Sequence, residues 1–162
     1  TVNIAKETGQ AATTVVYENI IKMWARCYAR SRGNAVWLIN QDVEPQLDML
    51  SMAVGTGGLE PRYIAYGPDG VLRIKGRPVL SVEYCATLGT VGDILLADFS
   101  EYNVIDKGGV QSASSIHVQF LTNETAFRFI YRVNGAPWWV AALTPKNGTN
   151  TVSPFIKLAT RS

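Results

Sequence analysis

The first part of the chain carries apolar residues at helical spacing. Between Ala11 and about Arg32 they form two adjacent stripes: Val16, Ile20, Met23 and Cys27, and beside them Tyr17, Ile21, Trp24 and Tyr28. Two adjacent stripes make an apolar face wider than about 100°, which predicts a helix over 11–32 that is buried on more than one side. Thr13 or Thr14 can cap its start, and Gly33 helps to end it.

Two short segments follow that helix. The apolar run 35–39 is rich in strand-forming residues and predicts a fully buried strand. Asp42 can cap a second helix over 43–53, with Pro45 in its first turn. The glycines that come next favour a loop running to Pro61.

From Arg62 onward the apolar period becomes two. Short strands are predicted over 63–66, 72–74 and 79–82, a buried strand over 93–97, extended chain over 99–105, and further strands over 138–143 and 155–158. Turn residues such as Pro, Asp and Gly separate most of these runs. The second part of the chain is therefore predicted to be rich in β-structure.

The strongest β signal is a hairpin. Residues 116–120 and 127–133 each alternate between apolar and polar positions, and Thr122-Asn123-Glu124 can make the turn between them. One face is aromatic and should be covered by another part of the structure. We expect a helix to cover it. The other face shows polar and basic groups, among them Arg128 and Arg132.

Composition and charge narrow the function classes. The 162 residues are 47% hydrophobic and 17% charged, below the roughly 25% of an average soluble domain. One domain or two intimate lobes fit this length, and the low charge suggests that some apolar surface contacts partners. The formal net charge of +2 lacks the clustered basic footprint of a dedicated nucleic-acid binder, since the cations over 22–32 fit a solvated helix face better. No run is long and apolar enough for a membrane span, so we expect no membrane partner.

Candidate catalytic groups do not form a recognisable constellation. Cys27 and Cys85 are far apart, and neither has a neighbour at the spacing of a zinc site. We expect both to be buried, reduced side chains of a cytoplasmic protein. His117 lies on the polar strand face without a nucleophile turn, and the carboxylates between Asp93 and Asp106 read as caps and turn residues. The glycines over 55–58 lack the lysine of a phosphate loop. We therefore expect no enzyme, no metal site and no cofactor.

An aromatic cluster keeps an alternative function open. Trp138 or Trp139, with Phe129 and Tyr131 nearby, could form a stacking platform. Adjacent strand residues point to opposite faces, so only one of the two tryptophans could join it. The alternative hypothesis is a β-rich module that binds carbohydrate or another ligand on an aromatic platform.

The order of segments resembles the axial domain of tailed-phage major capsid proteins. The matching segments are a helix followed by 34–40, a second helix ending in Leu50, Gly76-Arg77-Pro78-Val79, 92–102, and a long hairpin that carries 127–129 and 132–135. They span nearly the whole chain, and their order and spacing carry the resemblance. The missing initiator Met also indicates a cleaved product or a fragment of a longer polypeptide.

The resemblance implies an α+β tailed-phage major capsid fold, a mixed sheet flanked by helices plus a long antiparallel hairpin. Residues 1–111 and 136–162 would form the axial lobe, packed around five-fold and quasi-six-fold axes, and 112–135 the peripheral-lobe hairpin. The family's N-terminal arm, extended loop and spine helix would lie upstream. The implied function is structural: a phage or prophage subunit, made in the bacterial host cytoplasm, that self-assembles as pentamers and hexamers into an icosahedral capsid enclosing double-stranded DNA.

Five residues are candidates for contacts between subunits. Gly57 and Gly58 lie in the loop after the second predicted helix, and Gly89 lies in the loop 86–92; both loops would reach toward the ring axis. Arg128 and Arg132 would pair with acidic groups of a neighbouring subunit.

Overall fold

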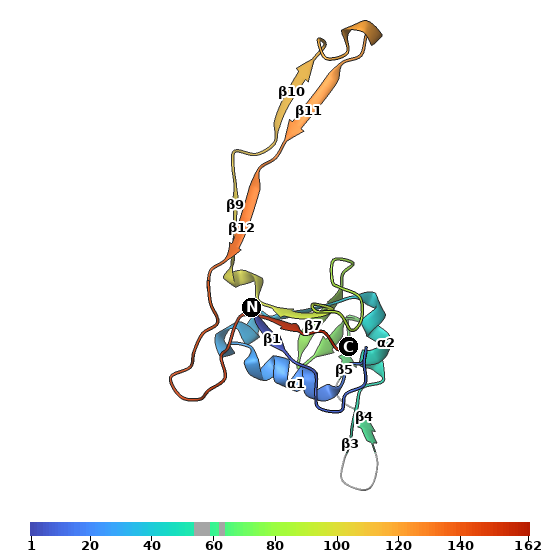
Figure 1. Cartoon of the computed structure of the whole chain (residues 1–162), viewed down its shortest axis with the longest axis vertical. Coiled ribbons are helices and arrows are strands. Elements are labelled where there is room, and N and C mark those ends of the chain that lie inside the picture. The colour runs from blue at the N-terminus through green and yellow to red at the C-terminus, as the bar shows by residue number, and fades with distance from the viewer. Residues whose placement is uncertain (54–58, 62–63) are drawn as a thin grey trace. The chain divides into compact units, whose positions relative to one another are not determined.

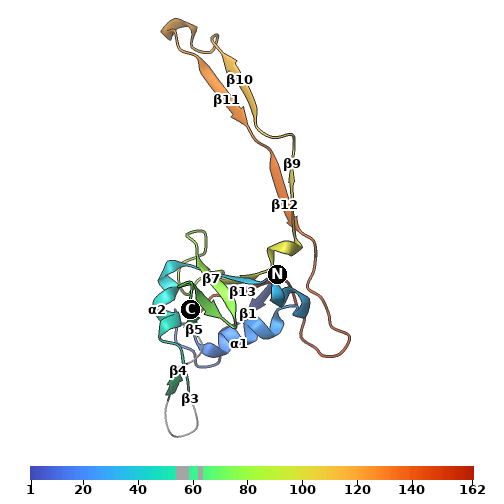
Figure 2. The ribbon, with the colours of Figure 1, turned by 180° about the vertical axis from the view of Figure 1, so that it is seen from behind.

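The computed structural model describes residues 1–53, 59–61 and 64–162, which fold into two compact units (Figures 1 and 2). One unit contains Thr1–Ser100 and Trp139–Ser162, and the other contains Glu101–Trp138. The second unit thus begins before and ends after the 112–135 segment expected from the sequence. The assignment of the units to axial and peripheral lobes remains a prediction.

The first unit is built on a mixed seven-stranded sheet in the order β1-β13-β8-β2-β7-β6-β5. Its strands are β1 (Val2–Ile4), β2 (Val36–Ile39), β5 (Ile64–Tyr66), β6 (Leu72–Ile74), β7 (Arg77–Ser81), β8 (Ile94–Ala97) and β13 (Phe155–Leu158). The pairs β1–β13 and β2–β7 are parallel, and the others are antiparallel. A separate antiparallel pair joins β3 (Ser51–Ala53) to β4 (Leu59–Pro61). The fold class is α+β, as predicted.

The core of the first unit lies around the central strands of this sheet. Trp37 on β2 is fully buried, and its indole nitrogen donates a hydrogen bond to the carbonyl of Ile74, 3.1 Å away. Leu96 on β8 and Ile156 on β13 face each other in register and are also buried. The strands predicted near 35–39, 93–97 and 155–158 are confirmed, although β2, predicted to be fully buried, alternates buried with half-buried positions.

The first helix is much shorter than predicted. Helix α1 spans Tyr17–Arg26, and a 3₁₀ turn over Ala29–Gly33 follows it. Its start is fixed by tertiary bonds: the Thr13 amide donates to the carbonyl of Arg161 (2.8 Å), so the expected threonine cap does not form. Its end is fixed by a parallel bridge between Cys27 and Ser153.

Helix α1 packs against β1 and β13. Ile20 and Met23 of one predicted stripe are fully buried, and in the other stripe Tyr17 is buried and Trp24 packs against the core, whereas Ile21 is 39% exposed. The expected wide buried face is therefore present in part, and Ile21 lies at its exposed edge.

The second helix is also shorter than predicted. Helix α2 spans Glu44–Asp48 after a 3₁₀ turn over Gln41–Val43, and residues 51–53 form strand β3 instead. Asn40 caps the 3₁₀ turn, where its side chain accepts a hydrogen bond from the Asp42 amide at 3.0 Å. Helix α2 itself has no side-chain cap, so the expected cap by Asp42 does not form. Strand pairing with β4 ends the helical segment early.

The second unit is a ribbon of two antiparallel strand pairs over residues 102–137, which we call the ribbon. Strand β9 (Tyr102–Asp106) pairs with β12 (Val133–Pro137), and β10 (Gln111–Ser115) pairs with β11 (Ala126–Ile130). Figure 1 shows both pairs as arrows running in opposite directions.

The predicted hairpin is present, but its pairing differs. The partner of β11 is 111–115, and residues 116–120 form no strand. The connection contains a 3₁₀ turn (Phe120–Thr122) and Asn123 in the left-handed region, with φ of 56°. The predicted strand 138–143 is wrong, since β12 ends at Pro137 and Leu143 forms only an isolated bridge to Val152.

The two cysteines are buried, as predicted, and are not joined in a disulfide. Burial raises the pKa of the Cys27 thiol from 9.0 to about 11; Asp98 adds to this and Arg32 opposes it. Burial also raises the pKa of Cys85, and the charge of Asp93 acts in the same direction. Separately, no helix among the described residues has both the length and the apolar character needed to cross a bilayer.

Candidate subunit-interface surfaces

The strand register gives the ribbon two different faces. On β10–β11, Phe127 lies opposite Ser114 and Phe129 lies opposite Ser112, so both aromatic rings stand over small polar partners on one face. Arg128, opposite Ala113, lies on the other face. The predicted shared face of the two phenylalanines is confirmed by this register.

The apolar side chains of the ribbon are exposed. Phe127 and Phe129 are each 69% exposed, and Phe120 and Leu121 in the loop are 72% and 98% exposed. The expected helical cover for the aromatic face is therefore not found among the described residues. Exposed apolar groups in this number mark a surface that contacts something else.

The two candidate arginines are both exposed. Arg128 lies in the middle of β11, whereas Arg132 lies in the short step between β11 and β12, where its carbonyl accepts a hydrogen bond from the Lys107 amide at 2.9 Å. Their guanidinium groups have no ion pair within the described part of the chain. They remain free to meet carboxylates from outside.

Gly89 is buried and sits in a tight connection. Its φ is +88°, and a Cβ atom on it would lie 2.7 Å from Cγ2 of Thr13 and 3.0 Å from the Thr13 Cα. Its amide donates to a carboxylate oxygen of Asp93 (2.9 Å), and its carbonyl accepts from the Arg161 amide (2.8 Å). This loop is therefore pinned to the core at Gly89. Gly57 and Gly58 lie outside the described residues.

A buried ion pair explains this pinning. The guanidinium of Arg161 donates to both carboxylate oxygens of Asp93, with Nη1 at 3.2 Å from Oδ1 and Nη2 bonded to Oδ2, and neither side chain is exposed. Nε also donates to the Thr14 carbonyl (2.6 Å), and Nη1 to the Ala159 carbonyl (3.1 Å). These bonds join three distant segments of the first unit, and we call them the Arg161 clasp.

The clasp was not found by sequence reasoning. The sequence pattern indicates only a cap or a candidate carboxylate at Asp93 and assigns no role to Arg161. The only signal was an isolated arginine near the chain end, and pairing it with Asp93 needs the tertiary fold to bring residues 93 and 161 together.

The other candidate catalytic side chains either hydrogen-bond to neighbouring residues or are exposed to solvent. Asp98 accepts hydrogen bonds from the amide (3.0 Å) and hydroxyl (2.6 Å) of Ser100, which is a cap-like role. His117 is exposed just beyond β10, where its amide donates to the Ser115 hydroxyl (3.3 Å). Among the described residues, no three His, Cys, Asp or Glu side chains gather as metal ligands would.

The tryptophan pair does not sit on a strand. Trp138 follows β12 and is 65% exposed, while Trp139 is 38% exposed and belongs to the first unit. The aromatic-platform hypothesis assumed that one of these rings lies on a strand face near Phe129, and neither tryptophan lies on a strand.

The fold is similar to that of solved capsid proteins. Over nearly its whole length, the chain resembles two solved capsids, that of an empty GTA particle and that of a native GTA particle, both computed with C5 symmetry. Each match has 16% identity and a TM-score of 0.64, and covers 99% of this chain. The chain spans about half the length of those capsid chains, 50% and 49% respectively. A comparison with curated proteins gave no match.

The family model gives the more specific result. The model described as the phage capsid family matches residues 2–147, which include the whole second unit and most of the first, with strand β13 outside the match. Sequence pattern, α+β fold and family model agree, and the chain belongs to the phage capsid family.

Proposed function

We propose that this chain is the part of a phage or prophage major capsid protein that builds the wall of an icosahedral head. The subunits assemble as pentamers and hexamers, enclose double-stranded DNA without reading its sequence, and catalyse no reaction. They are made in the bacterial host cytoplasm and end in the virion. The family match over residues 2–147 is the observation that carries this proposal.

The exposed apolar ribbon supports the same function. A two-stranded ribbon with aromatic residues on its surface is marginally stable by itself, and in a shell such a surface becomes buried against other segments and subunits. Heterologous contacts that close into rings need each copy to use lateral surface in this way. The likeness to capsids computed with C5 symmetry fits five-fold rings.

The direct test is shell formation. The complete gene product containing this sequence, expressed in bacteria and purified by sedimentation, should give closed particles in negative-stain electron microscopy. Nuclease-protected double-stranded DNA should be found in particles isolated from phage or induced cells. A product that stays monomeric at every concentration would reject the proposal.

The ribbon arginines provide a second, local test. We propose that Arg128 and Arg132 pair with acidic groups of a neighbouring subunit, because both are exposed and without an ion pair among the described residues. Arg128→Glu/Arg132→Glu should lower the yield of shells and leave the circular dichroism spectrum unchanged. Unchanged yield would remove these residues from the interface.

We also propose that residues 1–111 and 136–162 act as the axial lobe, with the loop 86–92 facing the ring axis. The pinning of Gly89 supports a fixed position for this loop. Inserting a short Gly-Ser segment after Thr90, which is exposed, should disturb capsomers more than the same insertion after Asn147, in the exposed loop before Val152.

A further inference from the structure

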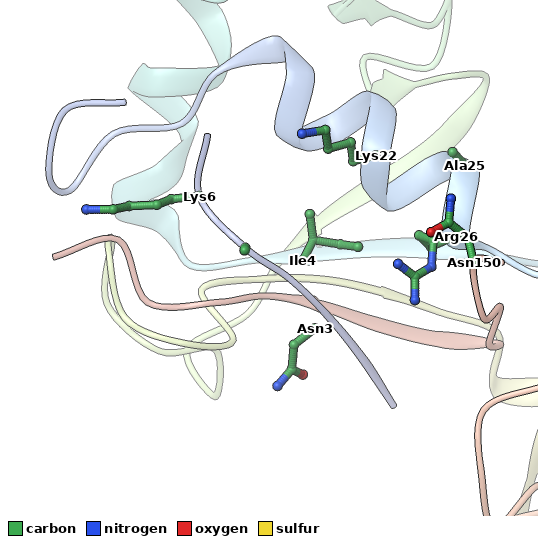
Figure 3. Close-up of a pocket in the computed structure, with 8 residues that line it drawn as sticks. Asn3, Ile4, Lys6, Lys22, Ala25, Arg26 and Asn150 are labelled. Atoms are coloured by element: carbon green, nitrogen blue, oxygen red, sulfur yellow. The ribbon is translucent and has the colours of Figure 1, made fainter. Parts of the chain in front are cut away.

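A pocket in the first unit has a cationic rim. It encloses about 380 Å³ between edge strand β1, helix α1 and Asn150, and Ile4 and Ala25 supply apolar lining (Figure 3). Lys6, Lys22 and Arg26 also line it, and they come from two separate segments. A small pocket with three cations around it fits carboxylate side chains better than a bulky or neutral group.

The three cations have fewer negatively charged partners within the described part of the subunit than they have positive charges. Nζ of Lys22 lies 2.5 Å from a carboxylate oxygen of Glu7. Arg26 donates to the carbonyl and the hydroxyl of Thr151, the latter at 2.7 Å, and Lys6 donates to the main-chain oxygen of Ser162. Three cations thus share one side-chain carboxylate, and the bonds to Thr151 hold the Arg26 guanidinium in place.

The spacing on α1 adds a second argument. Lys22 and Arg26 are four residues apart, so they lie one above the other on the same helix face. Like charges at this spacing repel and destabilise a helix. An anionic partner that contacts both would remove this repulsion.

The site is open to a neighbouring chain. β1 is the last strand of the sheet on this side. The Ile4 carbonyl accepts from the Ala159 amide (2.8 Å), so the backbone groups of the alternate residues Asn3 and Ala5 turn away from β13. Edge strands of this kind are where other chains approach a sheet.

Helix α2 carries the complementary pattern. Glu44 and Asp48 are also four residues apart, and neither has an ion-pair partner in the part of the chain that the structure describes. Asp48 is exposed, and Glu44 is half-buried and accepts a hydrogen bond from Ser81. Two helices therefore present like-charged pairs of opposite sign at the same spacing.

The two pairs face different sides of the first unit. α2 lies beside the start of α1, where the Val15 amide contacts the Gln46 side chain (3.4 Å), while Arg26 is at the other end of α1 (Figures 1 and 2). A ten-residue helix is about 15 Å long. One subunit that offers a cationic side and an acidic side suits a head-to-tail contact between copies.

We propose that the Lys22–Arg26 rim of this pocket binds the Glu44–Asp48 face of α2 from a neighbouring copy of the chain. The contact rests on the proposed capsid function and names the surfaces that join adjacent subunits within a ring. It contributes orientation and specificity between subunits, since charge complementarity selects register more than it adds affinity.

A charge swap tests this contact in the complete gene product. Lys22→Glu/Arg26→Glu and, separately, Glu44→Lys/Asp48→Lys should each reduce the yield of shells at least tenfold, because like charges then meet. The variant with all four substitutions should recover a large part of the lost yield, since the contact between copies is complementary again with reversed polarity, although the internal Lys22–Glu7 pair and the Arg26–Thr151 bonds stay broken. Yield is measured by sedimentation and electron microscopy.

Matched variants separate this contact from changes within the subunit. Glu7→Gln removes only the internal partner of Lys22, and Lys107→Glu/Lys146→Glu reverses two other exposed cations; both should assemble as the wild type does. If Glu7→Gln lowers the yield as much as the Lys22/Arg26 reversal, the effect lies inside the subunit and the inference fails.

Three further outcomes would overturn the inference. Wild-type yield from either reversal means that the surfaces do not meet. No recovery in the four-substitution variant means that they meet other groups. Normal empty shells with reduced DNA content from the Lys22/Arg26 reversal assign the rim to nucleic acid. If the wild-type product itself forms no shells, the proposed function fails instead.

Discussion

At the scale of single residues, the Arg161 clasp is a strongly constrained feature of the first unit. A bidentate arginine–carboxylate pair with no exposed surface links residues 13–14, 89–93 and 159–161. Desolvating two charges is costly, and here two further donors of the guanidinium bond backbone carbonyls. The consequence is a fixed conformation of three segments more than a large gain in stability.

Removing one side of the clasp should therefore be severe. Arg161→Ala leaves the Asp93 carboxylate buried without its partner and should lower the free energy of unfolding by about 3–5 kcal/mol. Arg161→Lys should recover only part of the loss, because an ammonium cannot bond both oxygens and two carbonyls in the same geometry. Urea denaturation followed by tryptophan fluorescence measures both.

The exposed pair Arg73–Asp69, with atoms 2.6 Å apart, provides the matched control. Arg73→Ala should leave the unfolding midpoint within error of the wild type, because solvent screens exposed pairs. Equal effects of Arg161→Ala and Arg73→Ala would contradict the role given to burial.

The Cys27 thiol predicts how stability depends on alkaline pH. Its folded pKa of about 11 lies above the ordinary 9.0, so the folded state keeps a proton that the unfolded state loses between these values. The contribution is fully present below pH 9 and disappears as the pH rises through 11. Thermal unfolding of wild type and Cys27→Ala should show a smaller pH slope for the variant between pH 9 and 11, and equal slopes there would be inconsistent with a buried neutral thiol.

At the scale of elements, the local pattern predicts where short strands form, whereas tertiary contacts set the ends of the helices and the strand register. Short buried strands such as β2 and β8 were predictable, because a brief run of strand-forming residues has few other ways to bury its apolar surface. The ends of α1 and α2 were not, because backbone bonds from residues 153 and 161 and the β3–β4 pairing end these helices. The hairpin register was missed because residues 111–115 are mostly serine and carry no apolar alternation.

Local stability should differ strongly between elements. The amides of β2 and β8 lie in the centre of the sheet, whereas the ribbon has one partner per strand and exposed side chains. Opening free energies range from about 0 to the global 5–15 kcal/mol, so ribbon amides should exchange at least about a hundredfold faster. Hydrogen exchange of this chain, followed by mass spectrometry, measures this difference. Equal protection of the ribbon and of β2 and β8 would mean that the ribbon is buried in the isolated chain.

At the scale of the whole molecule, exposed apolar side chains occur on both units and are frequent on the ribbon. The first unit buries a core around Trp37 and exposes some apolar side chains such as Met49 and Tyr84, while the ribbon leaves both rings, Phe127 and Phe129, exposed. A low fraction of charged residues together with exposed apolar side chains is what the proposed function leads us to expect. In a capsid subunit such contacts are small individually and are multiplied by the closed lattice.

Replacing the two rings should separate folding from assembly. Phe127→Ser/Phe129→Ser removes exposed apolar area, so the melting temperature of the isolated chain should change by less than about 2 °C, as expected for surface substitutions. Shell yield of the complete gene product should fall sharply, because the rings lose their contacts in the assembled wall. A large drop in melting temperature would show that the rings already pack within this chain.

The sequence by itself determined the α+β class, the central strands, the shared face of Phe127 and Phe129, and the family, because these depend on apolar period and on the order of segments. Only the tertiary structure decided where α1 and α2 end, which strand pairs with β11, and that Asp93 meets Arg161. These features depend on hydrogen bonds and ion pairs between residues far apart in the chain, and their free energies outweigh the small local preferences that a sequence displays.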